Sequence, residues 1–422
     1  TPLYSSAASD VYKRQPITSR GVVEISSSAG NTTVSGGVNS IGDLSIVGGD
    51  VAVNAAQTTT NSRNITIYPR TAYTGTGTLS SAGTLTISGG SNVGPTAAIQ
   101  AGGDITLSGT GTISNITGAT LTSTGGDVYL TSTASTVTIT KAVSAANIRV
   151  ESSGAFQTGT ERIAASQDVR IETTGANAAV TTGSGVLFAG RDIDVVASGA
   201  TTFGSSTTAS RFVSIESGST TALNNNISSG NQGILVKSVG RVTGSAGTNA
   251  GTPRLFGTAS GPITIWTTGT TGGVSLGNWT QLNTTQSGTS GADITIGGGA
   301  PSSTDANRPS GPARDSGADG IALGAASASS IVVMRAGSGN ISLSGEYTTV
   351  GTGGFSGILL LPGNDLVGNQ VSLRGVTGHN VDSGTAGTGI FAYYNSSVKT
   401  VIHATGSFPN PTAAVQLYSG SR

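Results

Sequence analysis

A short pattern that returns about every twenty residues constrains this 422-residue chain more than any other feature of its sequence. Between residues 104 and 171 it occurs four times, as Asp104-Ile105-Thr106-Leu107, Asp127-Val128-Tyr129-Leu130, Asn147-Ile148-Arg149-Val150 and Asp168-Val169-Arg170-Ile171. The first apolar residues of these copies are 23, 20 and 21 positions apart. A fixed period of this length, carried by a short strand, is typical of a solenoid whose turns stack on one another.

The same pattern extends well beyond this stretch. Steps of 20 to 24 residues separate the first apolar residues Val23, Leu44, Ile65, Leu85, Ile105, Val128, Ile148, Val169, Ile193, Val213 and Ile234. Within each copy two aliphatic residues flank a middle residue, so the aliphatics share one face of a strand and the middle residue lies on the other. A turn of this length fits two or three short strands. We therefore predict an all-β chain, a right-handed parallel β-helix with about 20–21 residues per rung.

The domain organisation follows from where the period holds. We expect a single β-helix domain over residues 20–422, because a solenoid grows by adding turns. Its rungs are regular over 20–240 and irregular over 241–422, where the strand pattern continues at uneven spacing. Loop insertions in this C-terminal half explain the uneven spacing, and the main one, 297–320, holds three Pro and no aliphatic alternation.

The first nineteen residues, 1–19, do not share the repeat. Their letters SSAASDVYKRQ resemble the translated adapter read-through that contaminates metagenomic gene sequences. Residues 1–15 are therefore either an artefact, in which case native chain lies upstream, or a frayed terminus of the native chain. We expect the first of these.

Composition excludes several classes of function. Only 9% of the residues are charged and the net charge is zero, against roughly 25% charged residues in an ordinary domain. We expect no nucleic acid or anionic membrane as a partner, because both favour an excess of Lys and Arg. No apolar run approaches the roughly 18 residues of a membrane span. The absence of Cys excludes disulfides and Cys-based metal sites.

The repeated words resemble a known class of bacterial proteins. Gly103-Asp104-Ile105-Thr106-Leu107, Gly126-Asp127-Val128-Tyr129-Leu130 and Gly190-Arg191-Asp192-Ile193-Asp194-Val195 are similar to the rungs of filamentous-haemagglutinin-like large exoproteins, and autotransporter passengers look alike at this level. The resemblance covers about residues 20–296 well and the remainder loosely. It implies a fragment of an extracellular or cell-surface adhesin. Its partners would be a cell-surface glycan or protein or a biofilm matrix, with an outer-membrane secretion partner for the full-length chain.

Three functions remain open at this stage. We favour a non-enzymatic adhesin stalk that makes multivalent contacts, without cofactor or metal. The first alternative is a carbohydrate-active β-helix enzyme, a polysaccharide lyase or hydrolase, since such enzymes share the fold. The second is a structural spacer without a ligand. Convergent carboxylates in one groove would favour the enzyme.

The middle residues of the rungs supply the first candidate sites. In chain order they begin with the hydroxyls of Ser45, Thr66, Thr86 and Thr106. One interpretation is that such a row binds an ordered surface or a glycan, but the favoured interpretation is that Ser and Thr simply suit an exposed strand, because the row ends at Tyr129. Further along, Arg149, Arg170 and Asp194 form a predicted surface cluster, whose plainer interpretation is an exposed ion pair worth less than about 1 kcal/mol.

The main insertion supplies the second candidate. Arg308, Arg314 and Asp315 give it charge, and function often concentrates on loops held by a rigid scaffold. We name it the predicted binding loop, although a plain solvated loop is the favoured interpretation.

Acidic residues directly before the rung strands, among them Asp104, Asp127 and Asp168, raise the question of a calcium ladder. The favoured interpretation is structural, because Asp and Asn at such corners hydrogen-bond to the backbone.

Overall fold

The computed structural model places most of the chain. It describes residues 10–13, 16–115, 120–247, 253–285, 291–301, 309–311, 313–315, 319–324, 332–347, 358–361, 364–377, 390–392, 401–404 and 415–421. These residues form strands and turns and contain no helix. Contacts divide the chain into two compact units, Thr1–Ser198 (unit 1) and Gly199–Arg422 (unit 2). The single domain expected over 20–422 stays a prediction.

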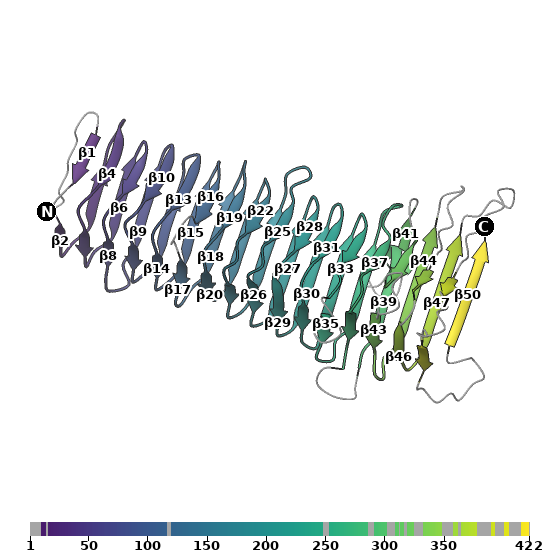
Figure 1. Cartoon of the computed structure of the whole chain (residues 1–422). Coiled ribbons are helices and arrows are strands. Elements are labelled where there is room, and N and C mark those ends of the chain that lie inside the picture. The colour runs from purple at the N-terminus through teal and green to yellow at the C-terminus, as the bar shows by residue number, and fades with distance from the viewer. Residues whose placement is uncertain are drawn as a thin grey trace. The chain divides into compact units, whose positions relative to one another are not determined.

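Each unit is a parallel β-solenoid, in which every turn contributes one strand to each of three sheets, A, B and C. Figure 1 shows the strands of each unit stacked side by side along the coil. The predicted all-β fold, a parallel β-helix, is confirmed.

In unit 1 the strands follow one another in the order A, B, C. Sheet A contains β1 (Asp10–Lys13), β4 (Asn31–Val34), β7 (Val51–Val53), β10 (Ala72–Gly75), β13 (Asn92–Pro95), β16 (Ile113–Asn115), β19 (Val137–Ile139), β22 (Phe156–Thr158) and β25 (Val180–Thr182). Sheet B contains β2 (Ile17–Ser19), β5 (Val38–Ser40), β8 (Gln57–Thr59), β11 (Leu79–Ser81), β14 (Ile99–Ala101), β17 (Leu121–Ser123), β20 (Val143–Ala145), β23 (Ile163–Ala165) and β26 (Val186–Ala189). Sheet C contains β3 (Val23–Ser26), β6 (Leu44–Gly48), β9 (Ile65–Pro69), β12 (Leu85–Ser88), β15 (Ile105–Gly109), β18 (Val128–Ser132), β21 (Ile148–Ser152), β24 (Val169–Thr173) and β27 (Asp192–Ala197).

Unit 2 has the same order with longer connections. Sheet A contains β28 (Thr201–Phe203), β31 (Thr221–Leu223), β34 (Val242–Gly244), β37 (Val274–Leu276), β42 (Ile321–Leu323), β45 (Ile358–Leu360) and β48 (Ile390–Ala392). Sheet B contains β29 (Ser206–Ala209), β32 (Ile227–Ser229), β35 (Arg254–Thr258), β38 (Thr280–Asn283), β43 (Val332–Arg335), β46 (Asp365–Gly368) and β49 (Val401–Ala404). Sheet C contains β30 (Phe212–Ser217), β33 (Gly233–Ser238), β36 (Ile263–Thr267), β39 (Ile294–Pro301), β44 (Ile341–Tyr347), β47 (Val371–Thr377) and β50 (Val415–Ser421).

All copies of the twenty-residue pattern lie in sheet C, the sheet with the longest strands. The first and third residues of each copy, the two aliphatics, point into the core and stack on the equivalent residues of the neighbouring turns. Leu85 and Ile87 of β12, for example, are fully buried and lie in register with Ile105 and Leu107 of β15. Sheets A and B close each turn, so the aliphatic ladders of sheet C form one wall of a continuous core within each unit.

The segment 1–19, predicted to lie outside the repeat, contributes two strands. β1 pairs in parallel with β4, and β2 pairs with β5. In each pair the partners are 21 residues apart, so the strands keep the period of the coil although their sequence lacks its aliphatic pattern.

The main insertion, 297–320, extends sheet C in unit 2. Its first residues lengthen β39, and β40 (Pro309–Gly311) pairs with them antiparallel. β41 (Ala313–Asp315) then pairs in parallel with the second half of β44. β40 and β41 are therefore joined by backbone pairing to the extended ends of β39 and β44.

Candidate functional site

The outer face of sheet C in unit 1 carries the predicted hydroxyls in one row. Ser45, Thr66, Thr86 and Thr106 occupy neighbouring strands in register, and we call them the hydroxyl row. All four are half-buried, because each packs against its neighbours along the row. Strands in a sheet lie about 4.8 Å apart, so the row offers one hydroxyl at each such step.

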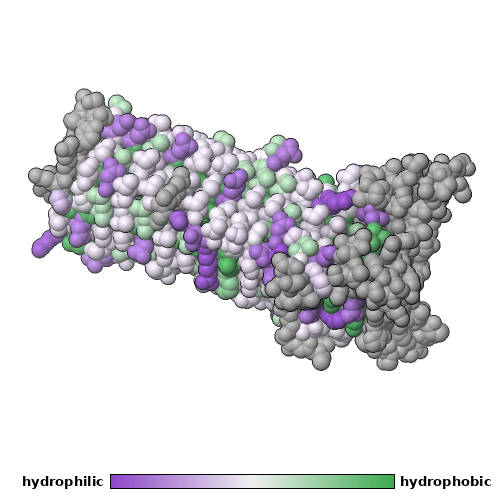
Figure 2. Space-filling view, viewed as in Figure 1, coloured by the Kyte–Doolittle hydropathy of each residue, from purple (hydrophilic) through white to green (hydrophobic). Residues whose placement is uncertain are grey.

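A second outward row runs beside the first, two residues further along each strand. It presents the half-buried Ser88 and Ser108, whose hydroxyls are 2.8 Å apart, and the 48% exposed ring of Tyr68. Tyr129 follows Thr106 in the hydroxyl row. Two phenol rings therefore flank a strip of aliphatic hydroxyls. Figure 2 shows residues of near-zero hydropathy over most of the visible face of unit 1.

The predicted surface cluster lies further along the same face. Arg149, Arg170 and Asp194 sit in register on β21, β24 and β27, as the period predicts. Arg170 Nη1 lies 3.8 Å from Asp194 Oδ2. The hydrogen bond to Glu172 and the charge of Asp194 raise the pKa of the Arg170 guanidinium, so it remains a cation.

Two carboxylates complete this cluster, and the sequence analysis missed both. Arg149 Nε donates to Glu151 Oε1 at 2.9 Å, and Arg170 Nη2 donates to Glu172 Oε2 at 3.0 Å. Glu151 and Glu172 lie in register and line a shallow hollow of about 300 Å³ with several Ser and Thr residues. They occupy the second outward position, outside the three-residue pattern, and a search of both outward positions would have found them. The result is an exposed cluster in which a row of two Arg and one Asp lies beside a row of two Glu, and each Arg pairs with the Glu of its own strand.

In several turns an Asp or Asn stands at the corner directly before the strand of sheet C, and its side-chain oxygen accepts a hydrogen bond from the backbone of the next turn. Asp104 Oδ1 accepts the amide N–H of Asp127 at 2.9 Å, and Asp127 Oδ1 accepts the amide N–H of Asn147 at 2.9 Å. In the same way, Asn64 Oδ1 accepts the amide N–H of Thr84, and Asp293 Oδ1 accepts the amide N–H of Asn340. Each acceptor thus fixes the start of the next turn, which agrees with the structural interpretation. Among the described residues, no group of three His, Cys, Asp or Glu is placed to hold a metal ion.

The predicted binding loop is described only in part. Arg308 lies outside the described residues, and so does the side chain of Asp315, although its backbone ends β41. Arg314 Nε donates to Glu346 Oε2 at 2.9 Å, and Glu346 is only 4% exposed. Arg314 therefore fastens β41 to β44. Neither interpretation of the loop, binding site or solvated segment, is decided by this contact.

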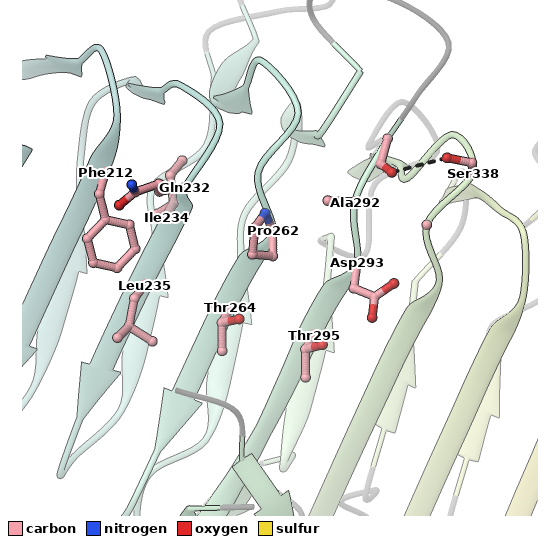
Figure 3. A pocket seen from close by; sticks show the side chains of 12 residues that line it. Phe212, Gln232, Ile234, Leu235, Pro262, Thr264, Ala292, Asp293, Thr295 and Ser338 are labelled. Atoms are coloured by element: carbon pink, nitrogen blue, oxygen red, sulfur yellow. Dashed lines mark hydrogen bonds between the residues drawn. The ribbon is translucent and has the colours of Figure 1, made fainter. Parts of the chain in front are cut away.

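A further hollow lies on the outer face of sheet C in unit 2, where no candidate was predicted. We call this cavity of about 520 Å³ the unit 2 groove. Leu235, Thr264 and Thr295 lie in register on β33, β36 and β39 and form its floor, as Figure 3 shows. They are 6%, 8% and 6% exposed, whereas the hydroxyl row of unit 1 is half-buried. The outward face is therefore recessed here.

The walls of the groove come from the corners before these strands. Phe212 begins β30, and its register partner on β33 is Gly233, with a φ of +96°. A Cβ atom at Gly233 would lie 2.1 Å from the carbonyl oxygen of Pro262, so no side chain fits there. Pro262, which also lines the groove, occupies the place that a side chain at residue 233 would take. Asp293 lies at the start of β39 (Figure 3).

An aromatic contact lies one step further along the same strands. Lys237 Nζ sits 5.2 Å above the Trp266 ring and 3.1 Å from Glu216 Oε2. Trp266 Nε1 donates to the carbonyl oxygen of Gly299 at 2.9 Å. These contacts tie the extended end of β39 to sheet C beside the groove.

No helix in the described part of the chain is long and apolar enough to cross a membrane. The chain matches no protein-family model, and neither a curated protein nor a solved structure is significantly similar to it. A function is therefore argued from the β-solenoid fold and from the outer face of sheet C in each unit.

Proposed function

We propose that this chain is part of a secreted or surface-displayed bacterial exoprotein, an adhesin stalk that makes multivalent contacts with cell-surface or matrix ligands. The observation that carries the proposal is the hydroxyl row on sheet C of unit 1, with Tyr68 and Tyr129 beside it. The row repeats one kind of contact at a fixed step along a rigid sheet.

Repetition suits a polymeric ligand. A single exposed hydroxyl gives little net binding, because it exchanges one hydrogen bond with water for another. A ligand chain that meets several equivalent hydroxyls is held by many such contacts, since each later contact forms intramolecularly. Extended glycans carry hydroxyls at regular intervals and apolar ring faces that pack on phenol rings, so they match this surface.

The charge balance fits the same ligands. Twenty Lys and Arg are balanced by twenty Asp and Glu, and the described cations of the surface cluster are paired with carboxylates. A neutral surface of this kind attracts polyanions weakly. The full-length chain would reach the cell surface with an outer-membrane secretion partner. The stalk needs no cofactor for this role and performs no catalysis.

The test replaces the hydroxyl row without disturbing the strands. Thr66, Thr86 and Thr106 are changed together to Val, which keeps the β-branched shape and removes the hydroxyl. The matched control changes Thr33, Thr74 and Thr138 to Val, because these residues point outward on sheet A. Binding of the labelled proteins is measured on immobilised β-glucan, chitosan and alginate and on bacterial and epithelial cells.

We expect the wild-type chain and the sheet A control to bind at least one of these surfaces, and the hydroxyl-row variant to bind it about tenfold less. If the two variants bind equally well, the hydroxyl row does not contribute to binding. If the wild-type chain binds nothing, the structural spacer becomes the better account.

A specific observation favours one second candidate, a carbohydrate-active enzyme. Glu151 and Glu172 lie on neighbouring strands beside a hollow, and glycoside hydrolysis uses a pair of carboxylates. Depolymerisation of the same polysaccharides, abolished by Glu151→Gln and Glu172→Gln, would establish this alternative. The adhesin proposal expects no change in polymer length.

A further inference from the structure

We propose that a hollow beside the main insertion of unit 2 binds the carboxylate of a uronic acid unit in a glycan, with Arg374 as the cation. We call it the insertion hollow, and its volume is about 210 Å³. That the ligand is a sugar rests on the proposed function, whereas the choice of a carboxylate rests on the lining of this hollow. Among the described lining residues, the insertion hollow shares only Thr295 with the unit 2 groove.

A change of strand partner opens the hollow. β39 runs parallel to β44 as far as the pair Ile296 and Leu343, and its end then pairs with β40. β41 lies beside β44 from Gly345 onward. Ser344 lies between these two pairings, and Gly297, the next residue of β39, has no side chain to fill the space. The route of the main chain therefore builds the hollow into the outer face of sheet C.

Serine hydroxyls line this hollow from two adjacent strands. Ser342 and Ser372 lie in register at the first outward position of β44 and β47, and Ser344 lies in register with Arg374 two residues further along. All three serines are half-buried, and in the described part of the chain no hydrogen bond engages their hydroxyls. Each hydroxyl can donate one hydrogen bond and accept others, so together they can surround the oxygens of one ligand group.

Arg374 supplies the one charge of the described lining. Its side chain is exposed, and among the described residues its guanidinium takes part in no ion pair or hydrogen bond. Arg314 and Arg335 of the same unit are instead paired with carboxylates. No Asp or Glu belongs to the described lining, so a carboxylate that enters meets a cation and hydroxyls. The planar guanidinium matches a carboxylate with two parallel hydrogen bonds.

The size and the remaining lining suit one sugar unit. Pro309 of β40 adds an apolar surface, on which the C–H face of a pyranose ring can pack and leave water. The hollow of about 210 Å³ is smaller than the pockets of about 300–1,000 Å³ that enclose drug-sized ligands. It therefore fits one acidic unit of a longer glycan, whose neighbouring units lie outside the hollow.

The test uses three probes that share one ring and differ at carbon 6, namely glucuronate, its neutral carboxamide and glucose. Binding to the full chain at neutral pH is followed on the Nε–H signal of Arg374 in nitrogen-15 NMR spectra, assigned by its absence in Arg374→Gln. We expect glucuronate to shift this signal and to bind at least about tenfold more tightly than the amide and glucose. Added salt should weaken only glucuronate, because it screens an exposed charge.

Four variants separate the charge from the hydroxyls, with calorimetry as the readout. Arg374→Gln should reduce glucuronate binding to the level of the amide, and Arg374→Lys should restore part of it, because Lys keeps the charge without the planar fork. Ser344→Ala with Ser372→Ala should weaken glucuronate about fivefold. The matched control is Arg63→Gln, which removes the same charge from an exposed arginine of unit 1 and should change nothing. Circular dichroism should be unchanged in all four, because these side chains lie outside the core.

The inference is overturned if glucuronate binds no better than its amide, if Arg374→Gln keeps the full affinity, or if Arg63→Gln loses as much. If inorganic sulfate shifts the Arg374 signal as readily as glucuronate does, the hollow binds anions in general and the assignment to a uronic acid is wrong.

Failure of this inference can be told from failure of the proposed function. Binding of neutral β-glucan through the hydroxyl row without binding of glucuronate refutes the insertion hollow alone. Binding of glucuronate by a chain that binds no polysaccharide and no cells upholds the carboxylate site and refutes the adhesin. The Thr→Val variants of the hydroxyl row should leave glucuronate binding intact.

Discussion

At the scale of single residues, the most informative side chain is the Asp or Asn that precedes several strands of sheet C and accepts a backbone hydrogen bond from the next turn. Asp127 accepts the amide N–H of Asn147 and also the phenol of Tyr129, whose oxygen lies 3.0 Å from Asp127 Oδ2. The sequence pattern predicted a polar corner residue at this position. It did not reveal that the bond joins consecutive turns, because that depends on strand register.

The Tyr129 phenol provides a titration test of this contact. The hydrogen bond to Asp127 is the main cause that raises the pKa of Tyr129, and partial burial adds to it. Because the folded pKa lies above the unfolded value of about 10, the bond stabilises the fold fully below that pH. Its contribution is lost as the pH rises through the folded pKa.

The difference in alkaline ultraviolet absorbance between the wild-type chain and Tyr129→Phe should therefore show a phenol titrating above about pH 10. Asp127→Asn should lower that pKa toward its ordinary value. An unchanged pKa in Asp127→Asn would mean that the carboxylate does not hold the phenol.

At the scale of strands, the sequence predicts sheet C far better than sheets A and B. Strands of sheet C carry two inward aliphatics, as Leu85 and Ile87 do in β12, and alternate clearly. β8 of sheet B instead buries Gln57 and Thr59, which give no apolar signal. In the second half, Val274 belongs to sheet A and Val332 to sheet B. Their strands made the spacing look irregular, because the pattern alone does not say which sheet a strand joins.

The candidate sites show the same limit. Register and period placed Arg149, Arg170 and Asp194 together, because their strands are consecutive copies of one pattern. The unit 2 groove was not predicted. It depends on register partners about thirty residues apart, such as Leu235 with Thr264 and Thr264 with Thr295, and no local pattern carries that information.

A core substitution tests the ladders of sheet C. Leu85→Ala should lower the stability of its turn by about 2–5 kcal/mol, because it leaves a cavity among buried aliphatics. Each turn of a solenoid contacts mainly its neighbours, so the loss should be local. Hydrogen exchange should accelerate in β9, β12 and β15 and much less in β24. Thr86→Ala, outward on the same strand, is the control and should change little. Equal acceleration throughout unit 1 would contradict a coil of separate turns.

At the scale of the whole molecule, the low content of charged residues bears on the proposed function. With 9% charged residues, the chain presents hydroxyls, amides and backbone in place of the usual charges. Repeated turns place those groups at a constant step within each unit. This constant step is what the proposed multivalent binding of long ligands requires.

The measurement that tests this account most directly is affinity as a function of ligand length. It uses the wild-type chain and neutral β-glucan fragments of three to twelve sugar units. The account predicts that affinity rises at least about tenfold over this series, and that the rise disappears when Thr66, Thr86 and Thr106 are Val. An affinity that is independent of length would contradict multivalent binding along the hydroxyl row.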